Sequence, residues 1–417
     1  MKELVIQGGK PLSGTIEISG AKNSAVALVP ASLLSDEEVI IDHIPNITDI
    51  DALDEILVYL GATLKRDGST MTIHSEHIQN KEIPESISKK LRASYYFMGA
   101  LLGKYKKVEM YFPGGCAIGK RPIDQHLKAF EALGANIQID GNKYKIEAKE
   151  LIGNDIYLDC ASVGATINAM LASVKAKGKT MIHNAAKEPE IVNVATLLNN
   201  MGAEIEGAGT SEIMIVGVER LGKAYIEVIP DRIEAGTYII LGALLGNPLT
   251  IENIIPNHIE ALLSKLKEIG IQYELSTNCI TVWASKNLTP TAVTTAVYPG
   301  FPTDLQQPIT TLLACIPGNS KVTETIYENR FQNVPYLNEL GANIDIQGDT
   351  LHIQGAEQLH GTKVQATDLR AGACLFLAGL KADGTTIIEH VEYVLRGYEN
   401  IIEKLTHVGA KIELKEI

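Results

Sequence analysis

The sequence has 417 residues, a formal net charge of −13, and 45% hydrophobic and 21% charged residues. A chain of this length exceeds one ordinary hydrophobic core, so we expect two domains. The acidic balance disfavours a nonspecific nucleic-acid-binding protein. No apolar run reaches the roughly 20 residues that cross a bilayer, and the first 20 residues are typical of a strand, a turn and a strand rather than a signal segment. We therefore expect a cytoplasmic protein.

The cysteines are few and show no paired spacing. There are five of them, an odd number, and no two form a Cys-x-x-Cys motif. They are Cys116, Cys160, Cys279, Cys315 and Cys374. The pattern predicts neither a disulfide framework nor a zinc site.

A short motif, a helical pattern ending at glycine, recurs along the whole chain. The six glycines are Gly61, Gly134, Gly202, Gly270, Gly341 and Gly409, and they are separated by 73, 68, 68, 71 and 68 residues. Two short strands of alternating hydrophobicity follow each glycine, as expected after a helix that ends in a left-handed glycine. A regular period of this length indicates a repeated supersecondary unit.

Each repeat is predicted as strand, helix, strand, helix, strand, strand. In the first repeat these elements are a strand at 15–19, a helix at 23–34, a strand at 38–44 and a helix at 50–60. The βαβ crossovers favour parallel pairing of the strands that they join. The first helix of every repeat is apolar on all sides, over 25–34, 97–102, 165–174, 238–245, 308–316 and 371–380. Such helices are buried, so we expect an α/β fold with helices inside and sheets outside.

Two similar domains follow if each contains three of the βαβαββ repeats. The division falls near residues 222–231. The opening strand at 4–9 has no repeat of its own, so we expect it to complete the C-terminal half. The predicted domains are residues 22–229, which include the loop with Cys116, and residues 1–21 with 230–417.

The few arginines lie at predicted helix starts. Six of the eight arginines do so, at Arg92, Arg121, Arg232, Arg330, Arg370 and Arg396. When the repeats are aligned on their glycines, the first helix opens at Lys22, Arg92, Ser162, Arg232, Asp304 and Arg370. A cation at a helix N-terminus costs up to about 1 kcal/mol. Cations gathered there beside free backbone N–H groups instead predict an anion site, for a phosphate with a carboxylate or for a diphosphate.

Two residues beside these cations are candidates for proton transfer. Cys116 lies in the Gly- and Pro-rich loop 113–122, just before Lys120 and Arg121, and positive charge near a helix start favours a thiolate. The alternative is a surface loop with an incidental cysteine. Asp304 is the candidate base, although an aspartate at a helix start is often only an N-cap. The histidines are scattered, and we interpret them as structural.

Five segments together resemble the enolpyruvyl transferases, and the resemblance runs from end to end. The segments are 19–23, 113–124, 162–166, 299–304 and 368–372. The resemblance implies an inside-out α/β fold whose two domains close on the substrate. It also implies transfer of the enolpyruvyl group of phosphoenolpyruvate to the 3-hydroxyl of UDP-N-acetylglucosamine, with release of phosphate, as the first committed step of peptidoglycan synthesis. The cysteine loop separates the chain from 5-enolpyruvylshikimate-3-phosphate synthase, which lacks it.

The resemblance also implies roles for individual residues. Cys116 would be the general acid, able to form a covalent adduct with the ligand, and Asp304 the general base. Phosphoenolpyruvate would be held by Lys22, Arg121, Arg330 and Arg396, supported by Asp368 and Arg370. The UDP-sugar would be held by Asn23, Arg92, Arg121, Pro122, Ile123, Asp124, Gln125, Ser162, Val163, Gly164, Asp304 and Ile326. The resemblance implies no metal or redox cofactor, no nucleic acid or membrane partner and no obligate protein partner.

One departure from the family is the segment Asn46-Ile47-Thr48, where several members carry a lysine and this chain has no cation. Three alternatives to the transferase remain open. One is an enzyme like 5-enolpyruvylshikimate-3-phosphate synthase. The second is a non-catalytic repeat protein that binds nucleotide sugars. The third is an RNA-terminal-phosphate cyclase, against which the acidic charge and the thiol loop weigh.

Overall fold

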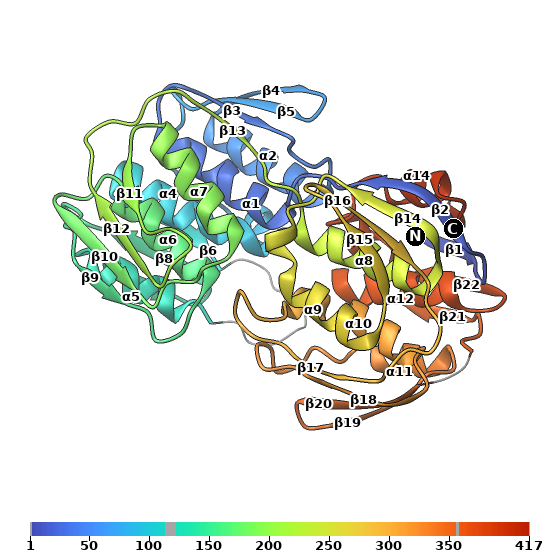
Figure 1. The fold of residues 1–417 in the computed structure, drawn as a ribbon. Coiled ribbons are helices and arrows are strands. Elements are labelled where there is room, and N and C mark those ends of the chain that lie inside the picture. The colour runs from blue at the N-terminus through green and yellow to red at the C-terminus, as the bar shows by residue number, and fades with distance from the viewer. Residues whose placement is uncertain (1, 113–121, 356–357, 417) are drawn as a thin grey trace. The chain divides into compact units, whose positions relative to one another are not determined.

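The computed structural model describes residues 2–112, 122–355 and 358–416 (Figure 1). These residues form two compact units. The first unit contains residues 20–112 and 122–229, and the second contains residues 2–19, 230–355 and 358–416. Within the described residues, no helix combines the length and the apolar character needed to cross a membrane.

The first unit contains three sheets in its described part. The first has the order β13 (Ala224–Glu227), β3 (Glu38–Asp42), β5 (Thr70–His74) and β4 (Thr63–Asp67). The second has the order β6 (Lys107–Tyr111), β8 (Lys143–Glu147) and β7 (Asn136–Asp140). The third has the order β11 (Glu204–Glu206), β12 (Glu212–Val216), β10 (Lys179–His183) and β9 (Asp155–Tyr157). Parallel pairs join β13 to β3 and β9 to β10, and the remaining pairs are antiparallel.

Three buried helices form the core of the first unit. They are α1 (Lys22–Ala31), α4 (Tyr96–Tyr105) and α6 (Val163–Ser173). All three helices are buried on every side apart from residues at their ends. Helix α4 packs against both α1 and α6. The other helical elements are η1 (Ser32–Leu34), α2 (Thr48–Leu60), α3 (Glu85–Ser88), η2 (Arg92–Tyr95), α5 (Asp124–Ala132) and α7 (Pro189–Asn200). The apolar sequence of the first helices therefore predicted their burial correctly.

The second unit also contains three sheets in its described part. The first has the order β15 (Gln272–Leu275), β16 (Cys279–Trp283), β14 (Gly246–Glu252) and β2 (Leu12–Glu17). The second has the order β17 (Ala292–Thr294), β18 (Gly318–Thr323), β20 (Thr350–Gly355) and β19 (Asn343–Gln347). The third has the order β21 (Lys363–Gln365), β22 (Thr385–Glu389), β1 (Lys2–Gln7) and β23 (Lys411–Glu416). In Figure 1 the blue strands β1 and β2 lie among the yellow and red elements of this unit. The expectation that the opening strand completes the C-terminal half is confirmed, since β1 pairs with β22 and β23.

The core of the second unit repeats that of the first. Its buried helices are α8 (Arg232–Leu245), α10 (Gln306–Ala314) and α12 (Leu369–Lys381), and they pack against one another. The other helical elements are η3 (Pro256–His258), α9 (Glu260–Ile269), η4 (Thr303–Leu305), α11 (Val334–Glu339), α13 (Glu392–Leu395) and α14 (Ile401–His407). Each unit is thus built of three similar repeats whose first helices lie inside. Five of the six repeats have the predicted opening strand in the described residues, whereas in the second repeat it is reduced to an isolated bridge between Ile83 and Met110.

The six repeat glycines share one backbone conformation. Gly61, Gly134, Gly202, Gly270, Gly341 and Gly409 have φ angles between 93° and 103°. Only glycine adopts this left-handed region without strain, so each position ends a helix and turns the chain into the next hairpin. The repeat predicted from the sequence is therefore present in the backbone six times.

One strand was assigned to the wrong repeat by the sequence pattern. We expected the strand at 15–19 to open the first repeat. The structure has β2 at Leu12–Glu17, and it pairs in parallel with β14 of the fourth repeat. The first repeat is completed instead by β13, which precedes α8 and opens the fourth repeat along the chain, and which pairs in parallel with β3. The alternation of residues predicts a strand but carries no information about its distant partner.

Candidate active-site residues

Asp304 lies between two arginine side chains of the second unit. Its Oδ1 accepts a hydrogen bond from Arg330 Nη2 at 2.7 Å, and its Oδ2 accepts one from Arg370 Nη2 at 3.0 Å. The carboxylate side chain is 24% exposed, whereas the two arginine side chains are only 4% and 5% exposed. A partly exposed carboxylate is therefore backed by two buried cations.

The helix start at Asp304 is not capped by this carboxylate. The N-cap of η4 is Pro302, which makes no side-chain capping bond, and α10 follows directly. Asp304 is therefore not an N-cap, which was the alternative to a catalytic role that the sequence left open. Its carboxylate instead engages Arg330 of the same repeat and Arg370 of the next one.

Two hydroxyl groups hold the two arginines. Arg330 Nη1 donates to Thr303 Oγ1 at 2.6 Å, and the Arg330 guanidinium lies 5.1 Å from the centre of the Tyr327 ring. Arg370 Nη1 donates to the Tyr398 hydroxyl at 3.3 Å. Among the described residues, the buried Nε of Arg330 has no hydrogen-bond partner. These contacts hold both guanidinium groups in place, and the Nε–H group of Arg330 remains without an acceptor in the described part of the chain.

Arg370 begins a helix with a capped N-terminus. Asp368 Oδ1 accepts from the backbone N–H groups of Arg370 and Ala371 at 2.8 and 3.0 Å. Burial lowers the pKa of the Arg370 guanidinium, but the charges of Asp304, Tyr398 and Asp231 outweigh burial and raise that pKa above its ordinary value. Arg370 is consequently a permanent cation at this site.

In the first unit, Lys22 opens α1 and forms an ion pair with α2. Lys22 Nζ lies 3.0 Å from Asp49 Oδ2, and Asp49 is buried in the first turn of α2. The segment 46–48, which lacks a cation in this chain, immediately precedes that turn. The ion pair with Asp49 thus fixes Lys22 against the first turn of α2, next to the segment 46–48.

The start of α5 places a second group of predicted residues in contact. Gln125 Nε2 donates to Asp124 Oδ2 at 2.8 Å and to Asp159 Oδ2 at 3.1 Å, and Gln125 Oε1 accepts from the Asp159 backbone N–H at 2.8 Å. Lys128 Nζ lies 2.7 Å from Asp159 Oδ1. These bonds fix α5 to the segment that leads to α6.

His126, interpreted from the sequence as structural, lies among the predicted sugar-binding residues. Its Nδ1 accepts from Asn168 Nδ2 at 2.8 Å, because Asn168 Oδ1 is already the acceptor for the Gly99 N–H. The ring proton is therefore on Nε2. Burial, helped by the positive charge of Arg92, lowers the pKa of His126 to about 3. A neutral ring at this position was not evident from a lone histidine on a helix.

Gly164, the second residue of α6, lies where a side chain would not fit. A Cβ atom there would come within 2.8 Å of His126 Cε1 and 3.0 Å of the Tyr95 hydroxyl. Ser162 caps the same helix by accepting from the Ala165 N–H at 3.3 Å. The start of α6 is thus capped by Ser162 and packed closely against His126.

The remaining predicted residues are placed as follows. Asn23 and Val163 are half-buried in the first turns of α1 and α6, Ile123 is buried just before α5, Pro122 is exposed, and Ile326 is exposed in the loop after β18. Arg92 opens η2 and lies 5.7 Å from the centre of the Phe112 ring. Cys116 and Arg121 lie outside the described residues.

Two arginines are displaced from the helix starts that we predicted. Arg396 is the C-cap of α13 and precedes α14 by five residues, and Arg330 precedes α11 by four. In both repeats the second helix is short, so the chain turns before the helix begins. The alignment of the repeats on their glycines placed both arginines shortly before the second helix, but it did not predict the irregular turns that separate them from that helix.

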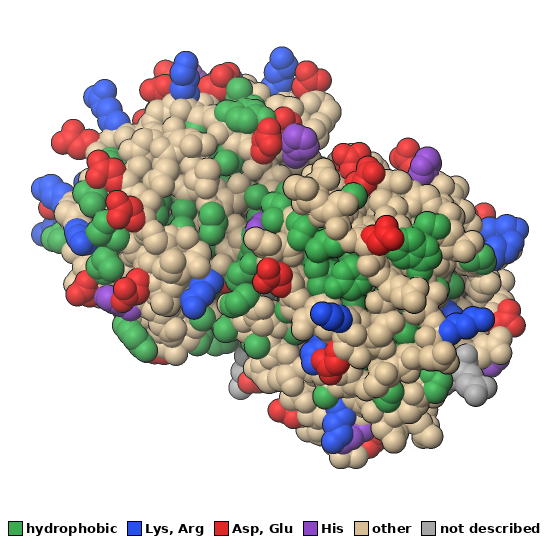
Figure 2. Space-filling view, viewed as in Figure 1, with side chains coloured by type: hydrophobic (Ala, Val, Ile, Leu, Met, Phe, Trp, Pro, Cys, Tyr) green, Lys and Arg blue, Asp and Glu red, His purple; other side chains and the backbone are tan. Residues whose placement is uncertain are grey.

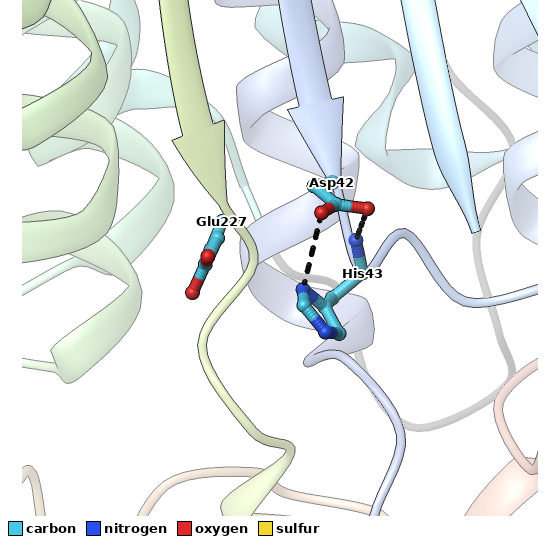
Figure 3. Close-up of side chains that lie close together, drawn as sticks. All are labelled: Asp42, His43 and Glu227. Carbon is cyan, nitrogen blue, oxygen red and sulfur yellow. Dashed lines mark hydrogen bonds and ion pairs between the residues drawn. The ribbon is translucent and has the colours of Figure 1, made fainter.

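One group in the described residues has the side chains to hold a metal ion. It consists of Asp42, His43 and Glu227, at the ends of the parallel strands β3 and β13 (Figure 3). The Tyr225 hydroxyl already bonds Asp42 Oδ2 at 3.0 Å and Glu227 Oε1 at 3.1 Å, and Thr70 donates to Asp42 at 2.8 Å. His43 and Glu227 are exposed, so internal hydrogen bonds and water account for the group. The face drawn in Figure 2 shows acidic and basic side chains interspersed on both units.

Comparisons with known proteins agree over the full length of the chain. The sequence model of the family described as EPSP synthase (3-phosphoshikimate 1-carboxyvinyltransferase) matches residues 6–405. UDP-N-acetylglucosamine 1-carboxyvinyltransferase 2 of Listeria monocytogenes is 51% identical over 409 residues, which cover 98% of this chain and 97% of that protein. UDP-N-acetylglucosamine 1-carboxyvinyltransferase 1 of Streptococcus agalactiae is 49% identical over 418 residues, covering 100% of both chains.

Solved structures show the same fold. The enolpyruvyl transferase NikO from Streptomyces tendae superposes with a TM-score of 0.90 at 27% identity and covers 99% of each chain. EPSP synthase from Acinetobacter baumannii superposes with a TM-score of 0.76 at 18% identity over 100% of each chain. By sequence along nearly its whole length and by fold, the chain belongs to the EPSP synthase family of enolpyruvyl transferases.

Proposed function

We propose that the chain transfers the enolpyruvyl group of phosphoenolpyruvate to the 3-hydroxyl of UDP-N-acetylglucosamine and releases phosphate. The observation that carries this proposal is the 49–51% identity, over nearly the full chain, with relatives named for that reaction. The likeness to EPSP synthase structures at 18% identity supports the fold alone. The reaction would be the first committed step of peptidoglycan synthesis and would take place in the cytoplasm.

The chemistry requires a base, an acid and a set of cations. Asp304 accepts the proton of the sugar hydroxyl while that oxygen attacks C2 of phosphoenolpyruvate, and Cys116 gives a proton to C3. The C2–O bond to phosphate then breaks and C3 loses a proton, which restores the double bond in the transferred group. Fixed cations stabilise the leaving phosphate without a metal ion.

The ion pairs of Asp304 suggest how the base becomes available. In the structure each of its carboxylate oxygens accepts from a guanidinium group. A bound phosphate or carboxylate group competes for those guanidinium donors, and Arg330 Nε is a further donor for it. Substrate anions thus release an Asp304 oxygen to accept the hydroxyl proton.

We assign the other predicted residues to binding, in two groups. Lys22, Arg121, Arg330, Arg370 and Arg396 hold phosphoenolpyruvate, with Asp368 fixing the helix that carries Arg370. Residues 122–125, 162–164, Asn23, Arg92 and Ile326 hold the UDP-sugar. In this proposal residues 22–229 form one domain, and residues 1–21 with 230–417 form the other.

Phosphate release measured with each acceptor tests the reaction. We expect release from phosphoenolpyruvate in the presence of UDP-N-acetylglucosamine and none with shikimate 3-phosphate. The opposite result would move the chain to the sister reaction, and binding of the UDP-sugar without turnover would indicate a non-catalytic protein.

Alkylation by an epoxide phosphonate that mimics phosphoenolpyruvate tests the thiol. Intact mass should show one adduct, lost in Cys116→Ser and kept in Cys160→Ser. Cys160 is the matched control because the residue is exposed, while partial desolvation of its thiol and the nearby carboxylates Asp124 and Asp159 raise the pKa of that thiol. An adduct that survives Cys116→Ser contradicts the assignment of the acid.

A further inference from the structure

A buried glutamate lies behind the cluster of Asp304 and Arg330. Glu324 follows β18 and is only 3% exposed. Within the described residues no lysine or arginine forms an ion pair with it, since its partners are all hydroxyl or backbone N–H donors. A buried carboxylate is costly unless hydrogen bonds compensate for lost water. We therefore look for a function of the buried Glu324 charge that a neutral side chain would not perform.

Each oxygen of Glu324 holds a different part of the cluster. Oε2 accepts from Thr303 Oγ1 at 2.7 Å. Oε1 accepts from Thr295 Oγ1 at 2.9 Å and from the backbone N–H groups of Ile326 and Tyr327 at 2.8 and 3.2 Å. One carboxylate thus joins the turn before Asp304 to the loop that carries Ile326.

The charge on Glu324 decides which way the Thr303 hydroxyl points. A carboxylate only accepts hydrogen bonds, so the Thr303 O–H donates to Glu324. The lone pairs of Thr303 Oγ1 are then directed to Arg330 Nη1, which lies 2.6 Å away. If the group facing Thr303 were an amide NH₂, the hydroxyl would have to accept from that donor as well as from Arg330.

The same carboxylate sets a second contact of Arg330. The N–H of Tyr327 is bound by Glu324 Oε1, and the Tyr327 ring lies 5.1 Å from the Arg330 guanidinium. Arg330 Nη2 in turn donates to Asp304 Oδ1 at 2.7 Å. The hydrogen bonds run in one direction, from Arg330 to Thr303 to Glu324, and the far side of Arg330 meets the base.

We propose that Glu324 is a positioning residue, which fixes Arg330 through Thr303 and thereby sets the placement of Asp304 and of the loop with Ile326. This inference rests on the proposed function, because it gives Asp304 and Arg330 a reaction to serve. It adds a residue that touches neither substrate and acts only through others.

Glu324→Gln is the central variant, because it keeps the size of the side chain and removes its charge. We expect kcat for phosphate release to fall by about tenfold to a hundredfold, the loss typical of a small misplacement of reacting groups. The matched control is Glu268→Gln in the same unit, where a carboxylate also accepts a threonine hydroxyl, that of Thr291. We expect the control to retain the activity of the unmodified protein.

Variants of Thr303 separate positioning from simple stability. Thr303→Val should reproduce the loss of Glu324→Gln, and Thr303→Ser should recover about tenfold relative to Thr303→Val. The double variant Glu324→Gln with Thr303→Val should be no slower than the slower single variant, because both changes break one path. Losses that multiply in the double variant would overturn the inference.

A structure of Glu324→Gln gives a readout that does not depend on turnover. We expect Arg330 Nη1 to leave Thr303 and the contact of Arg330 with Asp304 to lengthen. If both contacts stay as they are, the inference is wrong, whatever the activity. If the unmodified protein releases no phosphate with UDP-N-acetylglucosamine, the proposed function fails, and the structure alone then decides the role of Glu324.

Discussion

Asp304 and Arg370 form a hydrogen-bonded ion pair between the fifth and sixth repeats, with 3.0 Å between Oδ2 and Nη2. Arg370 uses its second terminal nitrogen to reach Tyr398, so one planar group serves two acceptors. A lysine ammonium is a point charge on a flexible stem and does not reproduce this fork. The geometry therefore makes the position specific for arginine.

Arg370→Lys should reduce kcat by at least about tenfold while the protein stays folded, because the charge is kept but the fork is lost. Steady-state phosphate release and circular dichroism measure the two effects. Arg66→Lys is the control, since Arg66 binds Asp54 through two nitrogens in the other unit and at a more exposed site. Equal losses in both variants would argue against a special role for Arg370.

Asp304→Asn should lower kcat by about 10²- to 10⁴-fold, the contribution typical of a general base. Binding of UDP-N-acetylglucosamine, measured by calorimetry, should weaken far less, because the amide keeps the size of the side chain. Asp345→Asn on β19 changes an exposed aspartate of the same unit and should match the unmodified protein. Unchanged turnover in Asp304→Asn would remove the base from the proposed mechanism.

Tyr398→Phe should destabilise the second unit by about 1 kcal/mol, the net value of a typical buried hydrogen bond. The lost hydroxyl pairs with Thr237 Oγ1 at 2.9 Å and accepts from Arg370, and Tyr398 is buried. Urea unfolding measures the change. Tyr336→Phe, whose hydroxyl meets Gln365 at an exposed position, should unfold like the unmodified protein. A Tyr398→Phe variant as stable as that control would show that Arg370 needs no such support.

His126 should make the stability of the first unit depend on pH. Its pKa is about 3 when folded, against an ordinary value of 6.5, because the ring is buried. The unfolded chain therefore binds the proton first. The stabilisation is complete above pH 6.5 and is lost as the pH falls from 6.5 towards 3, by about 2 kcal/mol at pH 5.

Urea unfolding at pH 7.5 and pH 5 tests this dependence. His126→Gln should lose less stability between the two pH values than the unmodified protein does. His77→Gln, at an exposed histidine, should keep the full difference. If His126→Gln and the unmodified protein change in parallel, the buried ring is not the source of the pH dependence.

Gly164→Ala should weaken binding of the UDP-sugar, because its Cβ would press on His126 and Tyr95 at the start of α6. Gly222→Ala is the control in the same unit, since the nearest atoms to its Cβ lie 3.9 Å away. Calorimetric titration with the nucleotide sugar compares them. Equal affinity in the two variants would place the ligand away from this helix start.

The repeat architecture could be predicted from the sequence because its signals are local. A helix-ending glycine such as Gly341 and an apolar helix such as α12 each mark their structure within a few residues. The partner of β2 could not be predicted, because strand pairing across more than 200 residues leaves no trace in either strand. The short α11 and α14 displaced Arg330 and Arg396 for a similar reason, since irregular turns carry weak patterns.

The residues of the candidate site also differ in whether the sequence alone could predict them. Asp304 and Arg370 were predictable because they occupy equivalent positions in successive repeats. Glu324, Thr303 and Tyr398 were not, since their importance lies in side-chain contacts with residues 21 to 28 positions away along the chain. Glu324 follows a strand and resembles an ordinary surface acid until its burial is known.

The place of β1 has a consequence for synthesis on the ribosome. This strand is made well before its neighbours β22 and β23, with which it pairs. The first unit can collapse into its own core while the edges of this strand are still open to water. Until β22 and β23 have emerged, the nascent chain thus carries an unpaired strand that can pair with another molecule.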